Sequence, residues 1–407
     1  MEMAVIVQTT SPDDGIKNIV ERIFDFRAKR AAAKSKRGFD SKVKMEVANE
    51  RLCRKYKEST LGDYADANFR YLKATGLVQT KGRGISIFQD KRALIEQLVK
   101  DTSLPANPLD YYKALCAGAN LPTDRKEGAL VVLEDLVHRL KARGITYDVK
   151  GKLLNNAANI AIERHKIEAM LFELEEEEYA AKQAELWEEI VDYMELLISR
   201  RRSKIRPNGE EIGIPQSEAP AYFEWTLWRA FLAIDHLKNK PYAARKFKID
   251  QDFLPVCTAP GNGPDLLFEF DDFVLVVEVT LTESSRQEAT EGEPVRRHVA
   301  NITERYHNKP VYGLFIAKRI DSNTAETFRI GMWYKSDDEK MRLDIVPITL
   351  EQFRDFFKTL FITRKSNPNY IRELLDSCSE PRVSHEAPAW KREIEKVLKR
   401  SIALLSE

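Results

Sequence analysis

Residues 260–281 read PGNGPDLLFEFDDFVLVVEVTL, and this stretch decides the fold of the second half of the chain. A glycine-rich turn leads into the apolar run 266–270, and Asp271-Asp272 separates that run from 273–281. Two runs rich in β-branched and aromatic residues around a short acidic turn are typical of a β-hairpin. The stretch therefore predicts two antiparallel strands at one end of a sheet.

The hairpin contains two carboxylates placed for chemistry. Asp265 starts the first strand, and Glu278, thirteen residues later, lies inside an almost wholly apolar strand. Burying a lone carboxylate costs several kcal/mol, so we expect Glu278 to be neutralised, paired or ligated. Two carboxylates on adjacent strands can share a Mg²⁺ ion, which takes oxygen ligands and keeps several waters. An ion pair of Glu278 with Lys318 or Arg297 is an equally good explanation from spacing alone.

The segments around this hairpin alternate between strand and helix patterns. Further strands are expected at 246–249, 253–256, 311–317 and 343–348, and helices at 221–237, 286–306, near Thr324 and at 351–361. Interleaved helices and strands predict a mixed sheet flanked by helices, in an α/β/α arrangement. The fold class of the whole chain is thus α+β and multidomain.

The N-terminal half has a different pattern. MEVANERLCRKYKES (45–59) and DYADANFRYLKATG (63–76) predict helices, and residues 77–88 predict a hairpin with the basic tip KGRG. Helix, helix and hairpin is the element order of a winged helix. This order would offer five side chains to DNA: Asn68, Arg70 and Lys73 to a groove, and Lys81 and Arg83 to phosphates. A small helical domain that packs against its neighbours is the alternative.

Composition divides the chain into four parts. We expect a basic segment at 1–40, a winged-helix-like domain at 41–104, a helical spacer at 105–206 and the mixed-sheet domain at 207–407. The last boundary is the clearest, because residues 206–220 collect prolines and glycines.

Charge and composition exclude several classes of protein. The 407 residues carry 65 Lys+Arg and 64 Asp+Glu, but residues 27–44 hold eight basic residues and one acid, and a second basic cluster spans 200–206. Such blocks can contact a polyanion locally, although charge runs are usually solvated helix faces. No apolar run approaches the roughly 20 residues of a membrane span, and the N-terminus lacks the pattern of a secretory signal. Four scattered cysteines without a CxxC pair argue against a disulfide framework or a zinc site. We therefore expect a cytoplasmic protein with no membrane partner.

Several segments resemble a known family. Pro264-Asp265 followed by Glu278-Val279-Thr280 is similar to the PD-(D/E)XK nuclease signature, with Thr280 in place of the usual lysine. Four surrounding segments resemble the cleavage domain of AlwI-like type IIS restriction and nicking endonucleases. They are PAYFEWTLWRAFLAI, PVCTAPGNGPD, VVEVTLTESSRQEATEGEPVRRHV and GLFIAK. DYADANFRYLKATGLV resembles the corresponding upstream segment. These enzymes carry a longer N-terminal recognition region, so we expect the winged helix to be only part of a DNA reader.

The resemblance implies a role for particular residues. It places the acidic site on Glu224, Asp265, Glu278 and Glu291, with His298 beside it. Asp265, Glu278 and the Val279 carbonyl would hold Mg²⁺, and Glu224 would complete that set or hold a second ion. Glu291 would orient or deprotonate water because Thr280 cannot act as a lysine does, and His298 would contact phosphate or move a proton.

The leading hypothesis is a Mg²⁺-dependent DNA endonuclease of the type IIS restriction or strand-nicking kind, acting on double-stranded DNA. One site of this type cuts one strand per event, so cutting both strands would need a second subunit or a homodimer. A DNA-binding protein with a catalytically idle nuclease fold is the alternative, motivated by Thr280. A helical interaction protein with an incidental α/β domain is a third reading.

Overall fold

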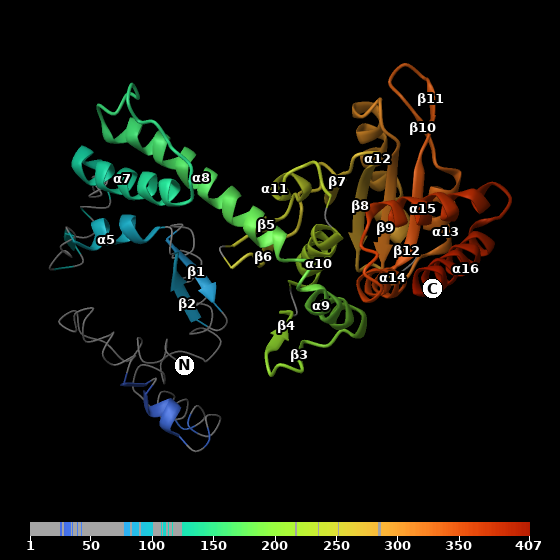
Figure 1. The fold of residues 1–407 in the computed structure, drawn as a ribbon, viewed down its shortest axis with the longest axis horizontal. Helices are drawn as coiled ribbons and strands as arrows, with labels where there is room; N and C mark the ends of the chain where they lie inside the picture. Colours follow the sequence, from blue (N-terminus) through green and yellow to red (C-terminus); the bar gives the residue numbers. More distant parts are fainter. Residues whose placement is uncertain are drawn as a thin grey trace. The chain divides into compact units, whose positions relative to one another are not determined.

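The computed structural model describes most of the second half of the chain and scattered parts of the first. The described residues are 25–26, 28–33, 35, 39, 42, 77–81, 84–88, 91–100, 107, 109–110, 113, 116, 124–215, 218–234, 236–250, 252–283 and 286–407. The chain forms two compact units, Met1–Ala119 and Asn120–Glu407 (Figure 1). The finer division into four parts stays a prediction.

The first unit contains the predicted hairpin. Strand β1 (Val78–Lys81) pairs antiparallel with β2 (Gly84–Ile87), with Val78 opposite Ile87, and helix α5 (Arg92–Lys100) follows. The two helices expected before the hairpin lie outside the described residues, as do Asn68, Arg70, Lys73 and Arg83, and only the backbone of Lys81 is described. The winged helix and its DNA contacts therefore stay predictions.

The second unit is built on a mixed sheet of four strands in the order β12-β9-β8-β7. These are β7 (Leu266–Glu269), β8 (Val274–Thr280), β9 (Val311–Ala317) and β12 (Asp344–Thr349). β7 pairs antiparallel with β8, whereas β8-β9 and β9-β12 are parallel. Every residue of β9 is buried, as are all of β8 except Val279, which explains why both strands read as continuous apolar runs. The predicted hairpin and mixed sheet are confirmed.

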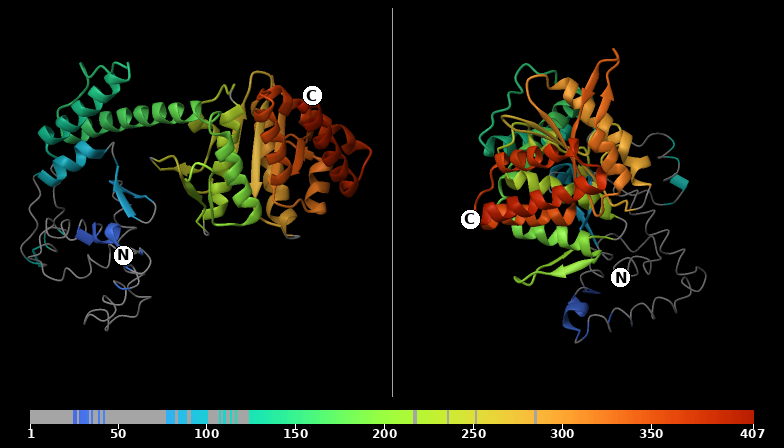
Figure 2. Two further views of the ribbon diagram at one scale, coloured as in Figure 1. Left: turned by 60° about the horizontal axis from the view of Figure 1, so that its bottom comes forward. Right: turned by 90° about the vertical axis from the view of Figure 1, so that its right-hand side faces the viewer.

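Helices cover both faces of this sheet (Figure 2). On one face lie α10 (Ala219–Ile234) and α14 (Leu350–Ile362), with α9 (Trp187–Ser199) against both. On the other face lie α12 (Glu293–Arg305) and α13 (Ser322–Ile330). Residues 221–234 of α10 are all buried, so its aromatic composition reflects packing on every side.

The remaining described elements of the second unit surround this core. They are α7 (Lys126–Ala142), α8 (Ala157–Ala181), the hairpin β3 (Ser203–Ile205) and β4 (Glu211–Gly213), α11 (Pro241–Ala244), the pair β5 (Lys248–Ile249) and β6 (Pro255–Cys257), the hairpin β10 (Met332–Tyr334) and β11 (Lys340–Arg342), α15 (Pro368–Ser379), η5 (Glu380–Val383) and α16 (Ala387–Ser406). The Pro- and Gly-rich stretch expected at a boundary contains the turn of the β3–β4 hairpin. None of the described helices has the length and apolar character that crossing a membrane requires.

The segment expected as one helix over 286–306 has two parts. Residues Glu288–Gly292 form a π-helical turn, η4, and α12 begins at Glu293 with Pro294 in its first turn. Proline is tolerated there because its missing N–H would have no partner inside the helix. π-turns within helices often lie at functional sites, and this one contains Glu291.

Candidate active site

The β7–β8 hairpin brings Asp265 and Glu278 together. Leu266 pairs with Val277, so Asp265, one residue earlier, lies beside Glu278 on the neighbouring strand. The Asp265 carboxylate accepts a hydrogen bond of 3.0 Å from the Val279 backbone N–H. The N–H and C=O of a strand residue point to the same neighbour, so the Val279 carbonyl lies on the side of Asp265. Two carboxylates and one carbonyl therefore meet where β7 begins.

Glu278 is paired with a histidine from the next helix. His298 of α12 places Nδ1 2.7 Å from Glu278 Oε1, and both side chains are buried. His298 Nε2 is also buried and has no hydrogen-bond partner among the described residues. This geometry corrects the alternative expectation that Glu278 forms an ion pair with Lys318 or Arg297. Lys318 lies 3.5 Å from Glu283 instead, and Arg297 pairs with Glu293. Neither cation neutralises Glu278.

Glu224 enters the same region from α10. Its carboxylate accepts a 2.7 Å hydrogen bond from the Ala259 N–H, in the loop that leads to Asp265. Burial, followed by the nearby charge of Asp265, raises the pKa of Glu224 to about 8. Glu224 also lines a cleft of about 360 Å³ whose other wall is the end of β8 and the residues after it, 279–282. This cleft gives the acid cluster an opening.

Glu291 lies on η4. Its pKa is influenced by Thr280, the residue that stands where the nuclease signature has lysine. Burial raises the pKa of Glu291 above its usual value, and hydrogen bonds from the side chains of Thr280 and Thr290 offset part of this rise. Thr280 thus lowers the pKa of the carboxylate to which the resemblance assigns the task of the missing lysine.

The acids repel one another electrostatically. Burial first, and then the charge of Glu278, raise the pKa of Asp265 to about 8. Burial also raises the pKa of Glu278 well above its usual value, and the charges of Glu291 and Glu224 add to the effect. Burial lowers the pKa of His298, which weakens the ability of this histidine to compensate the acids by taking up a proton. The cluster is therefore suited to a cation from outside the chain.

The donor set fits a Mg²⁺ ion. Among residues the structure describes, no three or more His, Cys, Asp or Glu side chains are grouped closely enough to hold a metal ion by themselves. Mg²⁺ does not require this, because it is usually bound by one or two carboxylates together with waters and substrate phosphates. Asp265, Glu278 and the Val279 carbonyl supply oxygen atoms only, as this ion prefers. The assignment of individual ligands, including Glu224, stays a prediction.

From the sequence, Gln287 was expected only to assist the site, because it lies near Glu291. Its side chain is fully buried and donates to the carbonyls of Thr282 (2.7 Å) and Arg319 (2.9 Å), while it accepts from the Asp321 N–H (2.9 Å). These bonds join the loops after β8 and β9 to the start of η4. A glutamine in a polar stretch gives no sequence signal of burial, so only its closeness to Glu291 pointed to it.

Comparison of the chain with known proteins gives one family match. A family model described as AlwI restriction endonuclease matches residues 1–356. Among solved structures, the small subunit of the heterodimeric restriction endonuclease R.BspD6I matches with 23% sequence identity and a TM-score of 0.39, over 52% of this chain and 98% of that chain. A search of curated proteins found no match.

Proposed function

Because the chain belongs to the AlwI restriction endonuclease family, we propose that it is a Mg²⁺-dependent endonuclease that hydrolyses phosphodiester bonds of double-stranded DNA. The proposal includes the finer class, a type IIS restriction or strand-nicking enzyme. The observation that carries it is that Asp265, Glu278 and Glu224 lie near one another, beside a cleft that Glu224 lines. Buried acids in mutual repulsion are stable together only if a cation or protons compensate them.

Each residue has a proposed task in this chemistry. Asp265, Glu278 and the Val279 carbonyl would hold Mg²⁺, which, when bound, supplies positive charge at the phosphate and lowers the pKa of the attacking water. Glu291 orients that water or takes its proton, with Thr280 fixing its carboxylate. His298 donates from Nδ1 to Glu278 and keeps that carboxylate in one orientation. Glu224 adds a third carboxylate at the cleft.

The alternative, a DNA-binding protein whose nuclease fold is idle, has one observation in its favour. Thr280 occupies the position where the nuclease signature has lysine. The buried Glu291 beside the other acids argues for an active enzyme, since it gives the site another group for the task of the lysine. We further propose that the predicted region 41–104 contributes contacts to DNA through Asn68, Arg70, Lys73, Lys81 and Arg83.

Plasmid cleavage by site variants tests the proposed function. Asp265→Ala and Glu278→Ala should each abolish relaxation of supercoiled plasmid with Mg²⁺, while binding of DNA in EDTA persists. Asp271→Ala is the matched control, because Asp271 is an exposed acid in the turn of the same hairpin, paired with Lys238 at the surface. It should cut at the rate of the unchanged protein.

Two outcomes test these hypotheses. If both site variants cut as fast as the control, the site assignment is wrong. If the unchanged protein binds DNA but does not cut with Mg²⁺, the idle alternative holds. Sequencing the ends of cleaved plasmid then identifies strand preference and distinguishes type IIS cleavage at fixed positions from unspecific cutting.

A further inference from the structure

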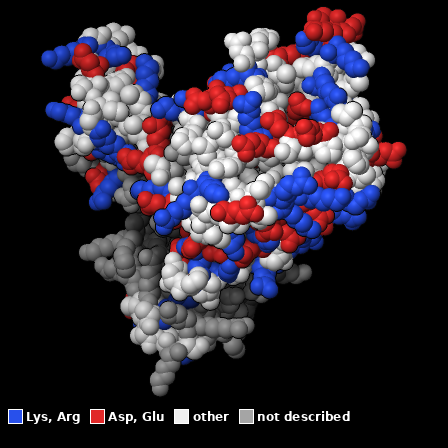
Figure 3. Space-filling view, turned by 45° about the vertical axis from the view of Figure 1, so that its right-hand side comes forward, with Lys and Arg blue, Asp and Glu red and all other residues white. Residues whose placement is uncertain are grey.

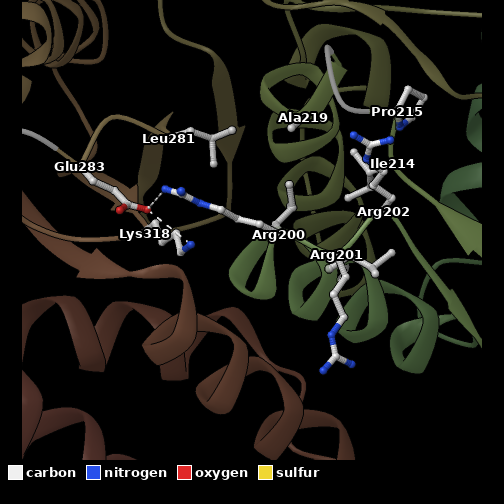
Figure 4. Close-up of a pocket in the computed structure, with 11 residues that line it drawn as sticks. Arg200, Arg201, Arg202, Ile214, Pro215, Ala219, Leu281, Glu283 and Lys318 are labelled. Atoms are coloured by element: carbon white, nitrogen blue, oxygen red, sulfur yellow. Dashed lines mark hydrogen bonds and ion pairs between the residues drawn. The ribbon is translucent and has the colours of Figure 1, made fainter.

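A second cavity opens beside the catalytic cleft and is lined by basic side chains. Its volume is about 420 Å³, and four cations line it: Arg200, Arg201, Arg202 and Lys318 (Figure 4). Among the residues that the structure describes, its single lining acid is Glu283, and Leu196, Leu197 and Ile214 form part of its apolar wall. We call it the arginine pocket. Leu281 lines both this pocket and the catalytic cleft, so the two are contiguous along the residues that follow β8.

The backbone at the end of α9 places Arg200 in the pocket. Arg200 is the C-cap residue of α9 and has a left-handed conformation, with φ at 55°. Glycine or asparagine is favoured at such a cap, and a larger side chain is strained there by an amount of order 1 kcal/mol. The arginine is thus placed at a position that its backbone conformation does not favour, which points to a task for its side chain.

Glu283 holds two of the cations. Arg200 Nη2 lies 2.7 Å from Glu283 Oε1, and Lys318 Nζ lies 3.5 Å from the same oxygen. Figure 4 shows Arg200 reaching across the pocket to this pair, whereas Arg201 and Arg202 extend in other directions. Glu283 comes from the loop after β8 and Lys318 from the end of β9, so the acid gathers cations from separate elements. Arg200 and Lys318 share this one carboxylate, so the two cations carry one positive charge more than the acid between them.

This local excess of positive charge contrasts with the face of the molecule in Figure 3. The net charge of the chain is +1, and on the face in Figure 3 basic and acidic side chains are interspersed. That face therefore offers no broad basic surface to a polyanion among the residues drawn in colour. A polyanion would be attracted where cations concentrate beside an apolar wall, because a lower local dielectric strengthens each ion pair.

We propose that the arginine pocket binds backbone phosphates of the DNA strand next to the scissile phosphate, with Glu283 holding Arg200 and Lys318 in place until a phosphate replaces it. This inference rests on the proposed nuclease function. Leu281 follows Glu278 by three residues, about 10 Å of extended chain, a span that a few nucleotides of one strand cover. Guanidinium groups suit the contact, since they bind phosphate oxygens in pairs. The pocket thereby positions the strand that the acid cluster cuts.

Salt-dependent binding tests the inference. The protein with Asp265→Ala, in EDTA, is titrated with a short DNA duplex at several salt concentrations, alone and combined with Arg200→Gln or Lys318→Gln. Each added variant should weaken binding and lower the slope of log affinity against log salt by about 1, as expected for one lost phosphate contact. Lys396→Gln and Lys399→Gln are matched controls, because each lysine pairs with a glutamate on the exposed side of α16. They should leave the slope unchanged.

Glu283→Gln distinguishes phosphate binding from a structural ion pair. If Glu283 competes with phosphate, its neutral variant should bind the duplex more tightly and with a salt dependence that is steeper by about 1 in the same slope. A purely structural pair predicts lower thermal stability without tighter binding, and that result overturns the inference. Equal slopes for pocket and control variants also overturn it while leaving the nuclease intact, if the unchanged protein still cuts. A protein that neither binds duplex nor cuts overturns both proposals.

Discussion

The side chain of His298 shows how burial determines the role of a single residue. From the family resemblance, His298 was expected to contact phosphate or to move a proton. In the structure, Nδ1 faces Glu278 at 2.7 Å and Nε2 is enclosed, so neither nitrogen is directed at the open cleft. We infer that His298 positions the Glu278 carboxylate.

His298→Ala and His298→Asn separate positioning from proton transfer. The alanine variant should lower cleavage by about 10–100-fold, the usual effect of losing a group that orients a ligand. Asparagine places an amide N–H near the position of Nδ1 and should recover most of the activity at an unchanged pH profile. Rates of plasmid nicking across pH check this. An asparagine variant as inactive as alanine would indicate proton transfer through the ring instead.

The raised pKa values of Glu224 and Asp265 predict how stability depends on pH without metal. Both pKa values lie at about 8, above the usual range of carboxyl groups in an unfolded chain. The folded protein then binds more protons than the unfolded chain between about pH 4 and 8, so stability falls as pH rises through this window. When the pKa of a group is higher by 1 in the folded protein, its ionisation costs about 1.4 kcal/mol of stability.

Thermal unfolding in EDTA measures the effect. The melting temperature should decline from about pH 6 to about pH 9, and Asp265→Asn should flatten the decline because its amide does not ionise. Added Mg²⁺ should stabilise more at the higher pH, where ionised acids are available to bind it. A melting temperature that rises over this range would contradict the proposed burial of these acids.

At the scale of elements, the sequence predicted the strands better than their surroundings. The run 273–281 contained enough apolar residues to identify β8, and the Asp271-Asp272 turn set the register that brings Asp265 to Glu278. The π-turn at Glu288–Gly292 was not predictable, because helical spacing over 286–306 is compatible with either hydrogen-bond pattern. The pairing of His298 with Glu278 depends on how α12 lies over β8, which spacing within one segment does not specify.

Gly313 sets the separation between α12 and the sheet. A Cβ at this position of β9 would lie 2.8 Å from Val299 of α12 and 2.9 Å from Ile345 of β12. Both neighbours are β-branched and stiff, so Gly313→Ala must move the helix or the strands. We expect a loss of about 1–3 kcal/mol of stability and lower activity, because α12 also contains His298.

Chemical denaturation and cleavage rates measure these two effects together. Gly261→Ala is the matched control for stability, since no atom lies within 4 Å of its added Cβ and its backbone is not left-handed. It should change the free energy of unfolding by less than about 0.5 kcal/mol. If Gly313→Ala is equally neutral, α12 packs less closely on β9 than the structure indicates.

At the scale of the molecule, α8 is joined firmly to the nuclease core of its unit. Arg245, next to α11, forms two hydrogen bonds of 2.7 and 2.8 Å with the fully buried Glu176 of α8. Removing one partner of such a pair leaves a buried charge uncompensated, which typically costs about 3–5 kcal/mol. This pair therefore joins α8 to the part of the unit that contains the sheet.

The number of strands cut per event is set by the number of acid clusters engaged. The proposed site takes all its acids, Glu224, Asp265, Glu278 and Glu291, from one chain, and it acts on one phosphodiester at a time. Under limiting enzyme, supercoiled plasmid should therefore accumulate as the nicked circle before linear product forms. Gel analysis over time, at several enzyme concentrations, follows both species.

The dependence on concentration shows whether a second copy of the chain makes the second cut. If a second copy makes the second cut, the amount of linear product should rise more steeply than in proportion to the enzyme concentration. Added Asp265→Ala protein should then suppress linearisation more than nicking, because a pair of one active and one inactive chain contains only one working site. If another subunit is required, the nicked circle should be the end product at every concentration. Linear DNA appearing without a nicked intermediate at the lowest enzyme concentration would contradict independent action of single chains.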